Sequence, residues 1–162
     1  VRQDKQKKRK SALKAARDNL TAAKDIFIEE VRPKISEKDW QRVHFLGKVP
    51  YEQFVKVLQI STVHVYLTYP FVLSWSLLEA MSAGACIVAS DTAPVREVIQ
   101  HHETGMLVDF FDYEGTADAV AAMLDSEQKR TSLGSRARDL IQSTYDLRDI
   151  CLPKQINWAE LI

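Results

Sequence analysis

The spacing of apolar positions indicates one long helix at the start of the chain. The helix is expected from about Asp4 to Val31, and from Leu13 onward its apolar positions recur at alternating intervals of three and four, which places them on one helical face. This stripe is formed by Leu13, Ala16, Leu20, Ala23 and Phe27. The segment has no Gly or Pro and ends before Pro33, which disfavours helical geometry at the residue preceding it. We therefore predict a basic amphipathic helix as a separate part of the chain, residues 1–34.

Beyond this helix the pattern changes to short β-branched runs separated by helical segments. Four runs are candidate strands: Val43–Leu46, Val63–Thr68, Ala85–Ser90 and Gly105–Asp109. Helical patterns lie near Tyr51–Leu58, Ser74–Ala83, Val95–Ile99, from Glu114 onward and over Gln128–Thr144. Alternating strands and helices imply right-handed crossovers and a parallel sheet. The predicted fold class is α/β, a Rossmann-like parallel sheet with helices on both faces, over residues 35–162.

Composition narrows the classes of partner. The chain has 22 basic and 22 acidic residues, so no net charge attracts it to nucleic acid. No apolar run approaches the roughly 20 residues that span a bilayer. The two cysteines, Cys86 and Cys151, form neither a zinc-binding pair nor a disulfide framework. We expect a cytoplasmic protein without metal or cofactor. The basic N-terminal residues have two interpretations: a solvated helix end, or peripheral contact with the inner face of the membrane.

The most informative stretch runs from Val63 to Asp91, as strand, loop, helix and strand. Ligands of open α/β sheets bind outside the carboxyl ends of the strands, and this loop lies at such an end. The following helix presents unpaired backbone N–H groups and a partial positive charge, which suit a diphosphate. Ser74 is the expected N-cap, and it could share its N–H partners with a phosphate oxygen.

Glu79 is the unusual residue of this helix, because its neighbours are apolar. One interpretation is that its carboxylate accepts hydrogen bonds from a ribose diol, and the alternative is that it faces water or pairs with a lysine. Trp75 and Ser76 precede it by four and three residues, so the three side chains project toward a similar side and could line one pocket. For Trp75 the alternative is packing in the core.

Four motifs of this region together resemble a known family. They are YPFVLSWSLLEAMSAG at 69–84, VASD at 88–91, EVI at 97–99 and ETGMLVD at 103–109. The combination resembles the C-terminal nucleotide-sugar-binding domain of GT-B glycosyltransferases, family 4. The resemblance covers the chain from about Arg42 to Leu124.

The resemblance implies a function and a set of binding residues. It implies the donor-binding part of a retaining glycosyltransferase, an enzyme that transfers a sugar from a nucleotide-sugar to an acceptor. Glu79 would hold the ribose, and backbone amides near Leu73–Ser76 would hold the diphosphate and sugar. The expected nucleotide-sugar-binding residues are Phe71, Val72, Leu73, Ser74, Trp75, Ser76 and Glu79, with no metal.

Two departures from the family pattern affect what we expect of catalysis. The family commonly has a second glutamate eight residues before the one that corresponds to Glu79, and this chain has Phe71 at that position. A phenylalanine side chain can neither accept hydrogen bonds from sugar hydroxyls nor stabilise positive charge as a carboxylate does. The catalytic residue is therefore unassigned. Similar proteins also carry two further strands, with an Arg and a Lys that clamp the diphosphate, and an N-terminal domain that binds the acceptor. We expect an N-terminally truncated chain that is inactive alone.

Alternatives to the enzyme remain open at this point. A non-catalytic nucleotide-sugar-binding or scaffolding protein could keep the fold and lose the acidic residue. A sugar-nucleotide epimerase of the same shape would need a reactive cluster of His, Asp and Glu, and the sequence shows none. We expect one continuous sheet that contains only three of the candidate strands: Val63–Thr68, Ala85–Ser90 and Gly105–Asp109. Val43–Leu46 would pair anew beside Val63–Thr68 or be poorly attached.

Overall fold

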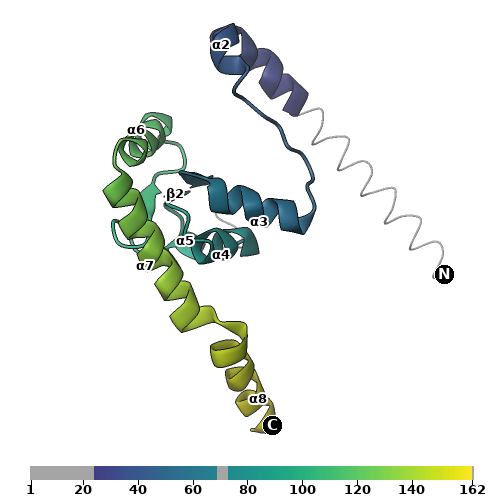
Figure 1. The fold of residues 1–162 in the computed structure, drawn as a ribbon, viewed down its shortest axis with the longest axis vertical. Helices are drawn as coiled ribbons and strands as arrows, with labels where there is room; N and C mark the ends of the chain where they lie inside the picture. The colour runs from purple at the N-terminus through teal and green to yellow at the C-terminus, as the bar shows by residue number, and fades with distance from the viewer. Residues whose placement is uncertain (1–23, 69–72, 162) are drawn as a thin grey trace, which may run out of the picture. The chain divides into compact units, whose positions relative to one another are not determined.

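A computed structural model of the chain describes residues 24–68 and 73–161. The chain divides into two compact units, with the division between Lys48 and Val49 (Figure 1). Residues 35–48, which the sequence groups with the Rossmann-like domain, belong to the first unit. Each unit is therefore described separately.

The first unit is helical over residues 24–31, in agreement with the end of the expected N-terminal helix, whose earlier residues lie outside the described part. A 3₁₀ turn, η1 (Arg32–Lys34), and a short helix, α2 (Glu37–Trp40), follow. The Arg32 guanidinium pairs with the Glu37 carboxylate and lies 5.0 Å from the centre of the Trp40 ring. These contacts of one cation with a carboxylate and an aromatic face hold the two short elements together.

The prediction of a strand at Val43–Leu46 is wrong. The segment has no regular structure, and each of its side chains is exposed. Phe45 lies 6.1 Å from Trp40, between ring centres, so it contacts a helix of its own unit. A β-branched run is a strand only where another strand offers its backbone, and this run pairs with none of the described strands. Of the two outcomes expected for this segment, pairing beside Val63–Thr68 does not occur.

The second unit contains a three-stranded sheet in the order β1-β2-β3. The strands are β1 (His64–Tyr66), β2 (Ile87–Ser90) and β3 (Met106–Val108). Both pairings are parallel, with His64 opposite Ile87 and Val88 opposite Met106. The three segments expected to form a continuous parallel sheet do so.

Helices connect and follow these strands in the predicted alternation. Before the sheet lies α3 (Tyr51–Ile60); between the strands lie α4 (Trp75–Ser82) and α5 (Ala93–Arg96). After β3 the chain forms α6 (Tyr113–Leu124), α7 (Glu127–Tyr145), the π-helical turn η2 (Leu147–Cys151) and α8 (Leu152–Glu160). No helix in the described part of the chain is long and apolar enough to span a membrane.

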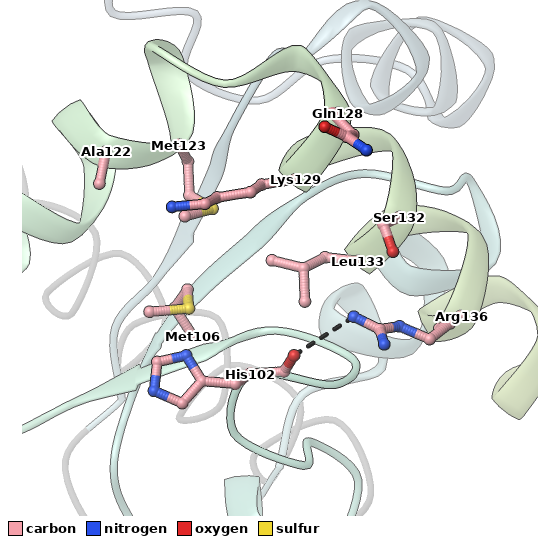
Figure 2. Close-up of a pocket in the computed structure, with 9 residues that line it drawn as sticks. All are labelled: His102, Met106, Ala122, Met123, Gln128, Lys129, Ser132, Leu133 and Arg136. Atoms are coloured by element: carbon pink, nitrogen blue, oxygen red, sulfur yellow. Dashed lines mark hydrogen bonds between the residues drawn. The ribbon is translucent and has the colours of Figure 1, made fainter.

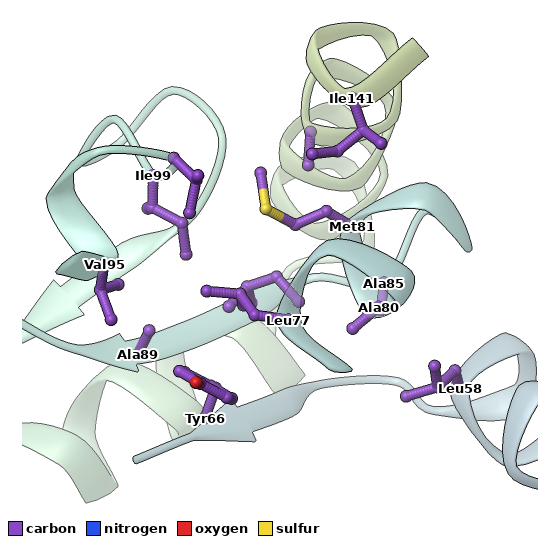
Figure 3. Close-up of a cluster of buried hydrophobic side chains, with 13 residues drawn as sticks. Leu58, Tyr66, Leu77, Ala80, Met81, Ala85, Ala89, Val95, Ile99 and Ile141 are labelled. Atoms are coloured by element: carbon purple, nitrogen blue, oxygen red, sulfur yellow. The ribbon is translucent and has the colours of Figure 1, made fainter. Parts of the chain in front are cut away.

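Strand β2 is buried on both of its faces, as expected for a parallel sheet between two helical layers. Ile87 and Ala89 join one apolar cluster with residues of α3, α4, α5 and α7 (Figure 3). Val88 belongs to a second cluster with Met123 of α6 and Leu133 of α7. Successive residues of a strand point to opposite faces, so these two clusters lie on opposite sides of the sheet. The prediction of helices on both faces is confirmed.

Helices α4 and α7 come together at two glycines. Gly84 follows the end of α4 with a φ of +78°, a left-handed conformation that suits glycine. A Cβ atom added to Gly134 of α7 would lie 2.2 Å from the Gly84 carbonyl oxygen. The two backbones therefore approach too closely for any side chain at Gly134.

We predict that Gly134→Ala lowers the free energy of unfolding by about 1–3 kcal/mol, because the added methyl group forces the two backbones apart. Urea denaturation followed by circular dichroism measures the change. Ser135→Ala, the exposed next residue of the same helix, is the matched control and should change stability by less than about 0.5 kcal/mol. Equal stabilities of the two variants would contradict the close approach.

Candidate functional site

The predicted binding residues lie at the carboxyl edge of the sheet. All three strands are parallel, so their carboxyl ends meet at this edge, and α4 begins there because it follows β1. Phe71 and Val72 lie outside the described residues. The remaining five, Leu73, Ser74, Trp75, Ser76 and Glu79, are all at or near the N-terminus of α4.

The N-terminus of α4 is capped as the sequence predicts. Ser74 has an extended backbone, and its Oγ accepts a hydrogen bond from the Ser76 amide at 3.3 Å. The same Oγ lies 2.9 Å from the Ser76 hydroxyl. Both serines are therefore part of the cap, and Leu73 packs its partly buried side chain against the core. The first turn of α4 presents backbone N–H groups at this edge.

Two hydrogen-bonded tethers hold the chain on either side of residues 69–72. On one side, the buried Ser90 hydroxyl accepts from the Thr68 amide at 2.9 Å and donates to the Thr68 carbonyl at 2.8 Å. On the other side, the Tyr66 hydroxyl accepts from the Ser74 amide at 3.0 Å. Strands β1 and β2 thus determine where the loop leaves the sheet and where α4 begins.

These supporting roles of Tyr66 and Ser90 are not among the predictions from the sequence. A signal existed for Tyr66, because a tyrosine in a buried strand has a hydroxyl that needs a polar partner. Its ring is 9% exposed within the core, so the hydroxyl reaches the helix cap from underneath (Figure 3). Which amide it would meet depends on the path of the loop, and the sequence does not show that path.

Glu79 has a partner that neither sequence-based interpretation names. Its carboxylate raises the pKa of the Tyr51 hydroxyl above the ordinary value of 10.0, first through a side-chain hydrogen bond and then through its negative charge. Tyr51 is the first residue of α3 and is exposed to solvent. Glu79 itself is partly buried. A carboxylate so placed is accessible from the carboxyl edge and keeps acceptor capacity for other hydroxyls.

Trp75 does not pack in the core, which was the alternative to a place in the site. Its side chain is 80% exposed. An exposed indole at the first residue of α4 is available for contact with a ligand or a partner surface.

One cation on the same edge is already paired. The Arg96 guanidinium donates to the Asp91 carboxylate at 2.8 Å, directly after β2. This hydrogen bond lowers the pKa of the Asp91 carboxyl below its ordinary value. Arg96 is therefore neutralised by a neighbouring carboxylate, which weakens it as a phosphate ligand. Among residues 24–68 and 73–161, no group of three or more His, Cys, Asp or Glu side chains is placed to hold a metal ion.

Ser90→Ala should lower the free energy of unfolding by about 1–3 kcal/mol, because it removes two hydrogen bonds from a buried site. Ser143→Ala is a matched control: its hydroxyl also donates to backbone carbonyls, at 2.8 Å to Asp139, but on the exposed surface of α7. Chemical denaturation of both variants tests the difference. If Ser90→Ala were no more destabilising than Ser143→Ala, the hydrogen bonds between Ser90 and Thr68 would not contribute to the free energy of unfolding.

The Tyr51 hydroxyl should titrate above the usual range, and Glu79→Gln should return its pKa toward 10.0, because the neutral amide removes the negative charge that opposes tyrosinate formation. ¹³C-labelled tyrosine followed by NMR between pH 8 and pH 12 measures the shift. Asp118→Asn, on the exposed side of α6, is the control for a general loss of negative charge. An unchanged pKa of Tyr51 in Glu79→Gln would show that the Glu79 carboxylate does not interact with the Tyr51 hydroxyl.

Comparison with known proteins gives one family. Residues 34–140 match the family described as "Glycosyl transferases group 1". N-acetyl-alpha-D-glucosaminyl L-malate synthase of Bacillus anthracis is 32% identical over 104 residues, which cover 64% of this chain and 27% of that protein. Phosphatidyl-myo-inositol mannosyltransferase of Mycolicibacterium smegmatis is 37% identical over 70 residues, covering 43% and 18% respectively. The chain thus spans about a quarter or less of these relatives.

A solved structure agrees in fold. HepE from Anabaena, in complex with UDP-glucose, aligns with a TM-score of 0.72 at 18% identity, covering 85% of this chain and 36% of that chain. The likeness supports the parallel sheet and its helices as a GT-B-type Rossmann-like arrangement. The family match includes all three strands, the cap of α4 and both tethers. The chain belongs to the glycosyl transferases group 1 family.

Proposed function

We propose that the second unit binds the nucleoside diphosphate of a sugar donor, as the donor-binding part of a retaining glycosyltransferase. The observation that supports this most is the N-terminus of α4, which two tethers hold at the carboxyl edge of the sheet, with the partly buried Glu79 one turn further along. Amides at a helix N-terminus favour a diphosphate, and a carboxylate beside them favours a diol.

The diphosphate would bind at the N-terminus of α4. Its oxygens would accept hydrogen bonds from the amides near Leu73–Ser76, and the Ser74 hydroxyl would share or yield its present amide partner, Ser76. In this proposal Phe71 and Val72 lie beside the sugar, and the exposed Trp75 adds apolar surface next to it. The binding needs no metal, because the helix amides supply the positive partial charge.

The ribose would bind at Glu79. A carboxylate offers about four lone-pair positions, so it can accept two hydroxyl groups. The Tyr51 hydroxyl lies near this carboxylate, which raises the pKa of that hydroxyl. The ribose diol would displace this hydroxyl or bind beside it, and Tyr51 at the start of α3 would then face the nucleoside.

The transfer reaction itself is proposed for the whole protein. The bond between sugar and diphosphate breaks and the diphosphate leaves with the bonding electrons. An acceptor hydroxyl bonds to the sugar carbon and gives its proton to the departing diphosphate. The acceptor would be held by a further domain, as in the GT-B arrangement that the motifs resemble. No residue of this chain is assigned to the chemical step, since Phe71 stands where the family commonly has a glutamate. That substitution favours one alternative, a nucleotide-sugar-binding protein without transferase activity.

We expect Glu79→Ala to weaken binding of the cognate nucleoside diphosphate at least tenfold, because hydrogen bonds to a charged acceptor contribute about 1.5–3 kcal/mol each. Isothermal titration calorimetry with UDP, GDP and ADP first identifies the nucleotide and then gives the dissociation constants.

The matched control is Glu114→Ala, an exposed carboxylate in the first turn of α6. It should bind the nucleotide like the parent. Equal affinities of Glu79→Ala and the parent would show that Glu79 does not contribute to nucleotide binding. Saturable binding without sugar transfer, measured in the protein that contains all its domains, would favour the non-catalytic alternative.

A further inference from the structure

A second concave site lies at the opposite edge of the sheet from α4's N-terminus. Strand β3 begins at Met106, α6 returns antiparallel to it, and α7 starts after the intervening turn. The last turn of α6, the first turns of α7 and the start of β3 therefore meet at the amino edge of the sheet. A pocket of about 460 Å³ opens there (Figure 2). This volume lies in the range of small-molecule sites.

The floor of this pocket is apolar. It is formed by Met123 and Leu133, which are 3% and 5% exposed, and by the partly buried Met106. Leu133 points into the middle of the space, and the thioethers of Met106 and Met123 both lie to one side of it in this view (Figure 2). Methionine side chains are flexible and polarizable, so such a floor adapts to apolar groups of different shape.

The rim of the pocket is cationic. Lys129 and Arg136 lie about two turns apart on the same face of α7. Both line the pocket, and no Asp or Glu is among the lining residues. Within the described residues the Lys129 ammonium has no hydrogen bond or ion pair. Arg136 donates one N–H to the His102 carbonyl at 3.2 Å, which leaves further donors of its fork available.

Within the part of the chain that the structure describes, neither of these two cations forms an ion pair, unlike Arg96 at the other edge, which Asp91 neutralises. An uncompensated pair of cations above an apolar floor is complementary to a molecule with an anionic head and an apolar body. A neutral apolar ligand would leave the cations unused, and a compact inorganic anion would leave the floor uncovered.

We infer that this pocket binds a small soluble amphipathic anion, a phosphate monoester or carboxylate on an apolar body. Its head lies between Lys129 and Arg136, and its apolar body lies on Met106, Met123 and Leu133. The site is separate from the proposed donor site and does not depend on it, since the two are at opposite edges of the sheet.

The three methionines of the chain allow a direct test. With ¹³C-methyl methionine, Met106 and Met123 report on the pocket, and the fully buried Met81 of the other core cluster is an internal control. The probe is 1-naphthyl phosphate, and 1-naphthol is its uncharged counterpart. We expect saturable shifts of Met106 and Met123 with the phosphate, an unchanged Met81, and at least tenfold weaker binding of the naphthol.

Variants separate the two cations from a general charge effect. Lys129→Gln should raise the dissociation constant about three- to fivefold, and the double variant with Arg136→Gln at least tenfold. Raising the salt concentration to 0.5 M should weaken binding in the same direction. Lys154→Gln, an exposed lysine of α8, is the matched control and should bind like the parent. Because Lys129 has no contact to lose, its variant remains informative if Arg136→Gln fails to fold.

Three results would overturn the inference. One is the absence of a saturable shift at Met106 and Met123 at millimolar probe. Another is equal affinity for 1-naphthyl phosphate and 1-naphthol, or equal affinity of the parent and the double variant. The third is a response of these methionines to vesicles of phosphatidylglycerol but not to the soluble phosphate, which would make the pocket a membrane contact.

Discussion

The pairing of β2 with both of its neighbours is the constraint on which the second unit depends. It is the strand of the described sheet that has a partner on each side, and its residues are buried from Ile87 to Ser90. One end of it fastens the loop before α4 through Ser90. Its two faces separate the apolar clusters against which the helices pack. A defect in β2 would therefore disturb the sheet, both helical layers and the candidate donor site together.

The elements that the sequence predicts well are those with a strong local signal. The expected helices over Ser74–Ala83 and Gln128–Thr144 agree closely with α4 and α7, because caps and apolar periodicity mark their ends. Val43–Leu46 has the local composition of a strand, yet it forms none, since strand formation requires a partner that local composition does not supply. The N-cap role of Ser74 was predictable for the same reason as the helices.

Two contacts of the candidate site that the sequence does not predict are long-range. Tyr51 and Glu79 come from different helices, and Ser90 meets Thr68 across two strands. No periodicity connects such pairs, because they meet only after α3 and α4 have packed. The pocket at the amino edge is a further case: its methionines and its cations come from β3, α6 and α7, and each of these residues reads as an ordinary helix or strand position on its own.

The meeting of Gly84 and Gly134 has an evolutionary consequence. What joins α4 to α7 at that point is backbone against backbone, with a bare hydrogen atom where every other residue would place carbon. The spacing of the two helices at this point is therefore set by backbone atoms. Descent within such a lineage would keep each glycine for its own reason, Gly134 for lack of space and Gly84 for its left-handed backbone.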